Sequence, residues 1–311
     1  MVALRIRNEA MELYFAYGAN LNKRECERWF LSQGLSNPLR KSCGRGRLPD
    51  MELCFDDDGT GDGRGTVNLH FRRGQWVEGQ LFELSPFGWE VLNRKESGDG
   101  RCCSPTCVHV FRDTGEVVEA VVYALVTEGR PHFVRPAEAY TSVILEGLDA
   151  FGLSRHQLDA AKKGHVPPLM IDTVFVYGTL MQGQGNHGLL AEGASVESIT
   201  RATVRADMVD LGGYPAAFRT ENSQIQGELI RVRRLEQVLR RLDGLEGFTG
   251  YHLDSLYHRV LALVDVETGL ACDAWIYLLA GSWKNYPVIA SGDWRGHRRA
   301  LNAMKHCTNS G

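Results

Sequence analysis

The stretch Tyr14-Phe15-Ala16-Tyr17-Gly18-Ala19-Asn20-Leu21 returns 160 positions later (177 minus 17) as Val174-Phe175-Val176-Tyr177-Gly178-Thr179-Leu180. Each copy is a run of β-branched or aromatic residues that breaks at a glycine, which is typical of a strand entering a tight loop. Two copies of one pattern indicate a duplicated unit rather than a solenoid, which needs at least three repeats.

Three further elements recur in the same order after each copy. They are an alternating strand that contains one glycine, an amphipathic helix, and a late strand that ends in a tyrosine. In chain order they are 78–84, a helix begun by Ser85 and Pro86, and 119–123 in the first copy, and 226–230, 235–242 and 273–277 in the second. The sequence therefore predicts two units with the same order of strands and helices.

A glutamate follows the helix in both copies. Glu96 lies 17 residues after Gly79 (96 minus 79), and Glu246 lies 19 residues after Gly227 (246 minus 227). A single glutamate at a helix end most often faces water. Because the position recurs in a duplicated unit, we interpret both carboxylates as functional.

The first glutamate shares a helix face with two large apolar residues, since Trp89, Leu92 and Glu96 lie at i, i+3 and i+7. Burial disfavours the charged form and raises a glutamate pKa from about 4.3 toward the range of about 6 to 7 that suits general acid/base catalysis. We therefore expect Glu96, and by repetition Glu246, to act as a proton shuttle.

The glycine-containing loop, Tyr17 to Leu21 in the first copy, brings several backbone N–H groups close together. Glycine lets a ligand approach the backbone, so such a loop suits a carboxylate or a developing oxyanion. The simpler interpretation is a tight turn without a ligand.

The length of 311 residues favours two domains of about 150 residues each. Helical stretches at 137–148 and 158–163 lead to the break Gly164-His165-Val166-Pro167-Pro168. We place the boundary there, which predicts domains 11–166 and 167–311.

The composition favours a small-molecule partner. Hydrophobic residues make up 43% and charged residues 23%, and the net charge of −3 gives no basic field for nucleic acid. Arg5, Arg7 and Glu9 interrupt the N-terminus where a signal peptide needs an apolar run, and no stretch of about 18 apolar residues follows. We expect a cytoplasmic protein with no membrane association, and its oligomeric state stays open.

No metal or redox cofactor is expected. Cys103, Cys107 and His109 fit no standard zinc spacing, and eight scattered cysteines make no disulfide framework. Gly183 to Gly188 matches the dinucleotide pattern G-x-G-x-x-G, but five residues separate it from the strand and no βαβ pattern follows. His187 and His252 have no counterparts in the first copy, which favours structural or substrate-edge roles.

Taken together, these residues resemble the gamma-glutamylcyclotransferase superfamily, which carries a Tyr-Gly-(Ser/Thr)-x-Leu-like loop, a Gly-x-Leu strand and a catalytic Glu. Residues 11–163 resemble the members that act on γ-glutamyl amino acids. Residues 171–280 are similar to the gamma-glutamylamine cyclotransferases, also through Gly213-Tyr214-Pro215 and Leu245-Glu246-Gly247.

The resemblance implies an α+β fold of two tandem small mixed β-barrel domains with flanking helices, each with its own pocket. It further implies cyclisation of a γ-glutamyl amide, which releases 5-oxoproline and a free amine without a cofactor. Glu96 and Glu246 would be the acid/base residues, and the substrate-binding candidates would be Tyr17, Gly18, Ala19, Asn20, Leu21, Tyr123, Tyr177, Gly178, Thr179, Leu180, Tyr214 and Tyr277.

The first copy departs from the family pattern, because Ser97 follows Glu96 in place of glycine and Arg101-Cys102-Cys103 stands where relatives carry an aromatic residue. Two alternatives stay open: a non-catalytic binding or assembly module, and transfer of the glutamyl group to water or another acceptor. We expect the amine half of the substrate to contact loops such as Cys43 to Asp62, whose sequence does not identify that amine.

Overall fold

A computed structural model describes residues 13–56, 63–96, 103–124, 132–251 and 255–308 of the chain. Contacts divide the chain into two compact units, residues 1–169 and 170–311. Within the described residues no helix is both long enough and apolar enough to span a membrane. Ser97, Arg101, Cys102 and His252 lie outside the described residues.

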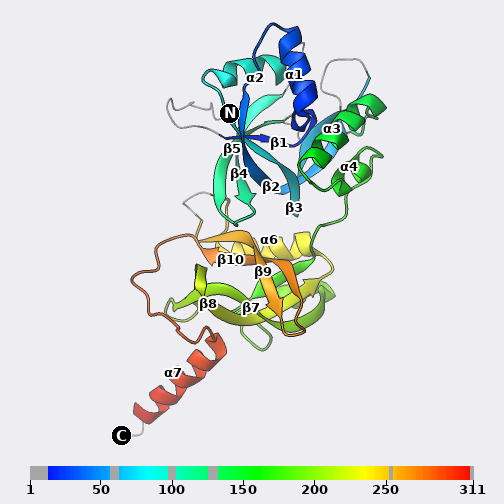
Figure 1. Ribbon diagram of the computed structural model, residues 1–311. Coiled ribbons are helices and arrows are strands. Elements are labelled where there is room, and N and C mark those ends of the chain that lie inside the picture. Colours follow the sequence, from blue (N-terminus) through cyan, green and yellow to red (C-terminus); the bar gives the residue numbers. More distant parts are fainter. Residues whose placement is uncertain (1–12, 57–62, 97–102, 125–131, 252–254, 309–311) are drawn as a thin grey trace. The chain divides into compact units, whose positions relative to one another are not determined.

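The first unit is a closed five-stranded barrel with helices around it. Its strands are β1 (Leu13–Ala16), β2 (Leu39–Asp56), β3 (Thr66–Leu84), β4 (Ser104–Arg112) and β5 (Val117–Ala124), and its helices are η1 (Ala19–Leu21), α1 (Lys23–Ser32), α2 (Gly88–Glu96), α3 (Glu138–Ala150) and α4 (His156–Ala161). The strand order is β1-β3-β2-β4-β5, with β1 parallel to β5 and the other pairs antiparallel. Figure 1 shows α1 and α2 at the same end of this barrel.

The second unit repeats this topology. Its strands are β6 (Thr173–Val176), β7 (Val196–Asp210), β8 (Pro215–Val232), β9 (Tyr257–Val266) and β10 (Ala271–Leu279), and its helices are α5 (Gly188–Ala191), η2 (Glu192–Ala194), α6 (Leu235–Glu246) and α7 (Trp294–Thr308). Starting from β6, the closed order β6-β8-β7-β9-β10 matches that of the first unit strand for strand. The α+β class with two mixed barrels, predicted from the sequence, is therefore confirmed.

The glycine that recurs in the long strand is required by the closure of each barrel. A Cβ atom on Gly79 would lie 2.3 Å from the carbonyl oxygen of Ala16, and one on Gly227 would lie 2.3 Å from that of Val176. Only a residue without a side chain permits this approach. The same contact in both units explains why the strand pattern keeps its glycine.

Two local expectations were wrong. The segment from Cys43 to Asp56 is strand rather than loop, because alternate side chains such as Leu53 and Phe55 are buried while the backbone pairs with β3; residues 57–62 lie outside the described residues. Helix α2 begins at Gly88 and not at Pro86. Phe87 has a left-handed φ of 60°, and the N–H of Gly88 donates to the Ser85 carbonyl, so a turn precedes the helix.

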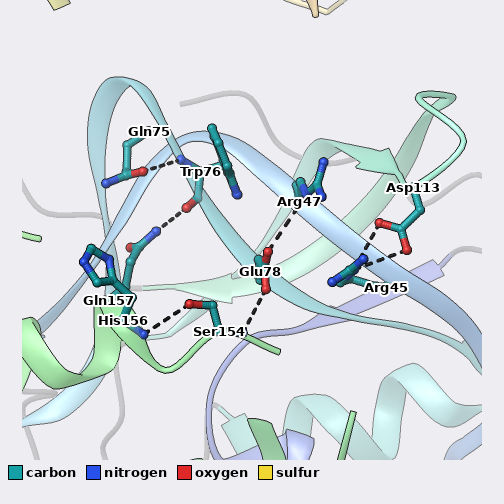
Figure 2. Close-up of polar contacts among 9 residues, drawn as sticks. All are labelled: Arg45, Arg47, Gln75, Trp76, Glu78, Asp113, Ser154, His156 and Gln157. Carbon is teal, nitrogen blue, oxygen red and sulfur yellow. Dashed lines mark hydrogen bonds and ion pairs between the residues drawn. The ribbon is translucent and has the colours of Figure 1, made fainter. Parts of the chain in front are cut away.

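A glutamine from α4 bridges β2 and β3 beside an interruption in their pairing. The partner of β2 jumps from Trp76 at Pro49 to Phe71 at Met51, so residues 72–75 have no register partner on β2. The buried Gln157 amide accepts from the N–H of Leu53 at 3.0 Å and donates to the carbonyl of Trp76. Figure 2 shows this side chain reaching Trp76 from the helix.

Replacing Gln157 by leucine should lower the free energy of unfolding of the first unit by about 2 kcal/mol, because two buried backbone groups lose their partners. The matched control is His156→Leu, one residue away on the exposed side of the same helix, which should change stability by less than about 0.5 kcal/mol. Urea unfolding of the full chain compares the two variants. Equal stability of both variants would contradict this role of Gln157.

Candidate active sites

The first barrel has a cavity of about 150 Å³ at the end where β1 leads into the glycine loop. Glu96, the last residue of α2, lines it together with the loop that follows β1. The full lining is Tyr14, Tyr17, Gly18, Ala19, Asn20, Thr66, Val67, Lys95, Glu96, Cys103, Tyr123 and Tyr140. The structure thus brings together the first-half candidates, with the exception of Leu21.

The carboxylate of Glu96 is tied directly to the loop. Its Oε1 accepts from Nδ2 of Asn20 at 2.8 Å and from Nζ of Lys95 at 3.1 Å. Lys95 also donates to Oδ1 of Asn20 at 2.6 Å, and Nδ2 of Asn20 donates to the hydroxyl of Tyr14 at 2.7 Å. The glutamate therefore sits in a network with one ammonium group, and its side chain is only 15% exposed.

The loop itself offers free hydrogen-bond donors. The N–H of Leu21 closes a turn on the carbonyl of Gly18 at 3.0 Å, and the Leu21 side chain is fully buried in the core, so Leu21 lies away from the cavity. Within the described part of the chain, the N–H groups of Gly18, Ala19 and Asn20 have no protein acceptor. Three N–H groups on one cavity wall suit an anionic or carbonyl oxygen.

The second barrel has a larger cavity, about 250 Å³, at the equivalent end. Its lining contains every candidate predicted for the second half: Tyr177, Gly178, Thr179, Leu180, Tyr214, Glu246 and Tyr277. Tyr214 is 46% exposed and so lies at the mouth. The remaining lining is Phe175, Val176, Asn186, Gly213, Pro215, Leu245, Leu256 and Tyr257.

Glu246 differs from Glu96 in its surroundings. Burial raises the pKa of Glu246 to about 7. Among the described residues no side chain or backbone group makes a hydrogen bond to its carboxylate. Glu96 shares its site with an ammonium group, whereas the described residues that line the cavity of Glu246 include no cationic side chain. The two sites therefore present the same carboxylate in different electrostatic environments.

The second glycine loop is held from behind by the residues after it. Asn186 donates from its backbone N–H to the carbonyl of Thr179 at 2.9 Å and from Nδ2 to Oγ1 of Thr179 at 3.0 Å. Nδ1 of His187 is 3.0 Å from the carbonyl oxygen of Leu180. His187 thus contacts the back of the loop, in agreement with a structural role. The part of the chain that the structure describes leaves the N–H groups of Gly178, Thr179 and Leu180 without protein acceptors.

Three tyrosines surround Glu246, and each hydroxyl proton is already committed to a protein oxygen. Tyr177 donates to the carbonyl of Tyr277 at 2.7 Å, Tyr257 to the carbonyl of Pro215 at 3.4 Å, and Tyr277 to Asp243 at 2.6 Å. Burial, with a smaller effect of the nearby Glu246 charge, raises the pKa of all three tyrosines well above the usual value. The three hydroxyl groups stay protonated. The wall beside Glu246 therefore offers hydroxyl oxygens as hydrogen-bond acceptors, and the glycine loop offers backbone N–H groups as donors.

The first unit repeats the core of this arrangement. Tyr17 donates to the carbonyl of Tyr123 at 2.7 Å, and the Tyr123 hydroxyl donates to Oδ1 of Asn93 at 2.5 Å. Asn93 lies three residues before Glu96, as Asp243 lies three residues before Glu246. Because this spacing is the same in both copies, it is a sequence signal that could have identified Asn93 and Asp243 as site residues, although neither was among the candidates.

Strand register identifies where the two sites differ. Tyr123 faces Pro105 across β4 and β5, and Tyr277 faces Arg259 across β9 and β10. Counting back two residues from Pro105 and from Arg259 aligns Cys103, which directly precedes β4, with Tyr257 of β9, and both line their cavities. The first site therefore has Cys103 where the second site has the aromatic residue Tyr257. Lys95, Tyr14, Tyr140 and Arg259 were not among the candidate site residues, because their approach to the sites depends on long-range packing.

Both halves of the chain match models of known protein families. Residues 174–296 match the family model described as "Gamma-glutamyl cyclotransferase, AIG2-like", and residues 76–160 match the "AIG2-like family" model. A solved structure titled "Gamma-glutamyl cyclotransferase" aligns with a TM-score of 0.41 and 20% identity, over 50% of this chain and 89% of that one.

Two named relatives are similar over most of their own length. The gamma-L-glutamyl-butirosin B gamma-glutamyl cyclotransferase of Niallia circulans is 30% identical over 132 residues, which are 42% of this chain and 80% of that protein. A Vibrio cholerae protein that carries a gamma-glutamylcyclotransferase name is 33% identical over 122 residues, 39% of this chain and 93% of that one. With two matching family models and a 30% identical relative covered over 80% of its length, the chain belongs to the gamma-glutamyl cyclotransferase, AIG2-like family.

Proposed function

We propose that the protein cyclises a γ-glutamyl amide to 5-oxoproline and a free amine, with Glu96 and Glu246 as the proton-transferring residues of two sites. One observation supports this most directly. In each unit a glutamate at a helix end faces a loop with free N–H donors, and tyrosine oxygens with committed protons lie beside the glutamate.

This distribution of donors and acceptors suits the two ends of a glutamyl group. The N–H groups of Gly178 to Leu180 would hold a carboxylate or the carbonyl oxygen that becomes negative in the transition state. The acceptor-rich wall near Glu246 and Tyr277 would hold the α-ammonium group. The corresponding roles in the first unit fall on Gly18 to Asn20 and on Glu96 with Tyr123.

The reaction needs only atoms that the substrate already contains. The α-nitrogen attacks the γ-carbonyl carbon, the new C–N bond closes a five-membered ring, and the bond to the leaving nitrogen breaks. Two protons leave the attacking ammonium group, and both end on the leaving amine by way of the glutamate. Because the attack is intramolecular, the protein has to fold the substrate, stabilise the oxyanion and move protons.

The test is identification of the glutamyl product by mass spectrometry after incubation of the full chain with a panel of γ-glutamyl amino acids and γ-glutamyl amines. We expect 5-oxoproline and the free amine from wild type, and neither product above background from Glu96→Gln/Glu246→Gln. Free glutamate would indicate hydrolysis instead, and a new γ-glutamyl amide would indicate transfer. Binding of substrate without any product would favour the non-catalytic alternative.

A further inference from the structure

The second unit contains a buried ion pair directly behind its cavity. Arg259 is completely buried, and its Nε lies 3.0 Å from Oδ1 of Asp243. The guanidinium carbon lies 5.1 Å from the centre of the Phe248 ring and 5.0 Å from that of Trp275. Removing two charges from water costs about as much free energy as their mutual attraction returns. A contribution to stability is therefore not a sufficient reason for this pair to be buried here.

The pair makes one contact that reaches the cavity. The hydroxyl of Tyr277, which lines the cavity, donates to the same Oδ1 of Asp243 at 2.6 Å. A hydroxyl whose proton is bonded to a carboxylate keeps its oxygen lone pairs for a donor on the other side. A charged acceptor also polarises that hydroxyl more strongly than a neutral one does.

The first unit shows what the same position looks like without charge. There the hydroxyl of Tyr123 donates to Oδ1 of Asn93, and the strand position that matches Arg259 is Pro105. Carboxylate and guanidinium are thus replaced together, and a neutral amide is sufficient to orient the tyrosine. The charge in the second unit must therefore do more than fix the ring.

We infer that Asp243 and Arg259 are positioning residues that make the Tyr277 hydroxyl a strong hydrogen-bond acceptor for the α-ammonium group of the substrate at the second site. This inference rests on the function proposed above. Asp243 supplies the charged acceptor, and Arg259 neutralises the carboxylate so that it can stay buried. Neither residue touches the substrate; both act through Tyr277.

The test uses full-length protein in which Glu96→Gln silences the first site. The variant Asp243→Asn/Arg259→Met copies the neutral arrangement of Asn93, and the unbranched methionine can fill the space between the two rings. Two ligands separate the roles: a γ-glutamyl amide, and the matching glutaryl amide, which lacks the α-amino group and cannot cyclise. Turnover of the first gives kcat/KM, and inhibition by the second gives its inhibition constant.

We expect kcat/KM for the γ-glutamyl amide to fall about tenfold, the difference between a charge-assisted and a neutral hydrogen bond. The inhibition constant of the glutaryl amide should change less than about twofold, because that ligand makes no ammonium contact. Tyr277→Phe should show the same selectivity with a larger loss, because it removes the hydroxyl altogether, and adding the pair substitutions to Tyr277→Phe should cause no further loss. The exposed pair variant Asp172→Asn/Arg231→Met is the control and should leave both values unchanged.

Three results would decide against the inference. Equal losses for both ligands would indicate a merely structural pair, and unchanged values for both would show that the charge does not reach the substrate. If the Glu96→Gln parent releases no 5-oxoproline from any substrate, the proposed function of the second site fails and the inference falls with it. If the Glu96→Gln parent does release 5-oxoproline but the pair variant shows no selective loss on the γ-glutamyl amide, the inference fails and the proposed function stands.

Discussion

Replacing Glu246 by glutamine, in a chain whose first site already carries Glu96→Gln, should lower the rate of 5-oxoproline release by about 10²- to 10⁴-fold. Glutamine keeps the shape of the side chain but cannot take a proton from the α-ammonium group. The reciprocal comparison, Glu246→Gln against the double variant, measures the contribution of Glu96 in the same way. Quantified 5-oxoproline at saturating substrate gives both ratios.

Matched controls keep this result specific to the two cavities. Glu90 lies on the same helix as Glu96 but is exposed, and Glu192 is an exposed glutamate of the second unit. Glu90→Gln and Glu192→Gln should leave turnover within about twofold. If one single variant is inactive and the other is not, one barrel is the catalyst and its copy has another role. Full activity in the double variant would remove both glutamates from the mechanism.

The duplicated pattern made much of the fold predictable from the sequence. The local signals are a strand followed by Tyr-Gly, a second strand with one glycine, and a helix that ends in glutamate. The glycine of the second strand, Gly79 or Gly227, is needed because the barrel closes against β1 or β6 at that point. Both glutamates consequently lie where the pattern indicated, each in a cavity beside its glycine loop.

The rest of each site depends on pairings between distant strands, which no local pattern contains. Arg259 reaches Asp243 only because β9 is in register with β10, and Lys95 meets Asn20 only because α2 packs over the glycine loop. The length of β2 was missed because its first part, Cys43 to Arg47, is rich in glycine and arginine and shows no apolar alternation, so only its pairing with β3 reveals a strand there. The two sites therefore look alike in the sequence and differ in their electrostatics in the structure.

Because Glu246 is buried without a cationic partner among the described residues, the activity of the second site should depend on pH. Burial raises the pKa of Glu246 to about 7, and a base must be ionised to act. In the Glu96→Gln chain, kcat/KM should therefore rise with pH and level off above about pH 7, with about one tenth of the plateau value one pH unit below the pKa. A profile that is flat from about pH 6 to pH 8 would contradict the assignment of Glu246 as the base.

The same buried carboxylate should lower the stability of the second unit as pH rises. Between the unfolded pKa of about 4.3 and the folded pKa of about 7, the folded state binds more protons than the unfolded state, so the free energy of unfolding falls with increasing pH and becomes constant above that range. Glu246→Gln removes this dependence. Allowing for partial exposure of the side chain, the variant should gain about 2 to 3 kcal/mol over wild type between about pH 5 and pH 8.

Urea unfolding at both pH values measures this gain in the free energy of unfolding, with Glu192→Gln as the exposed control. A difference between wild type and Glu246→Gln that does not change with pH would show that the carboxylate is ionised in the folded protein throughout, and would leave the second site without a base tuned by burial.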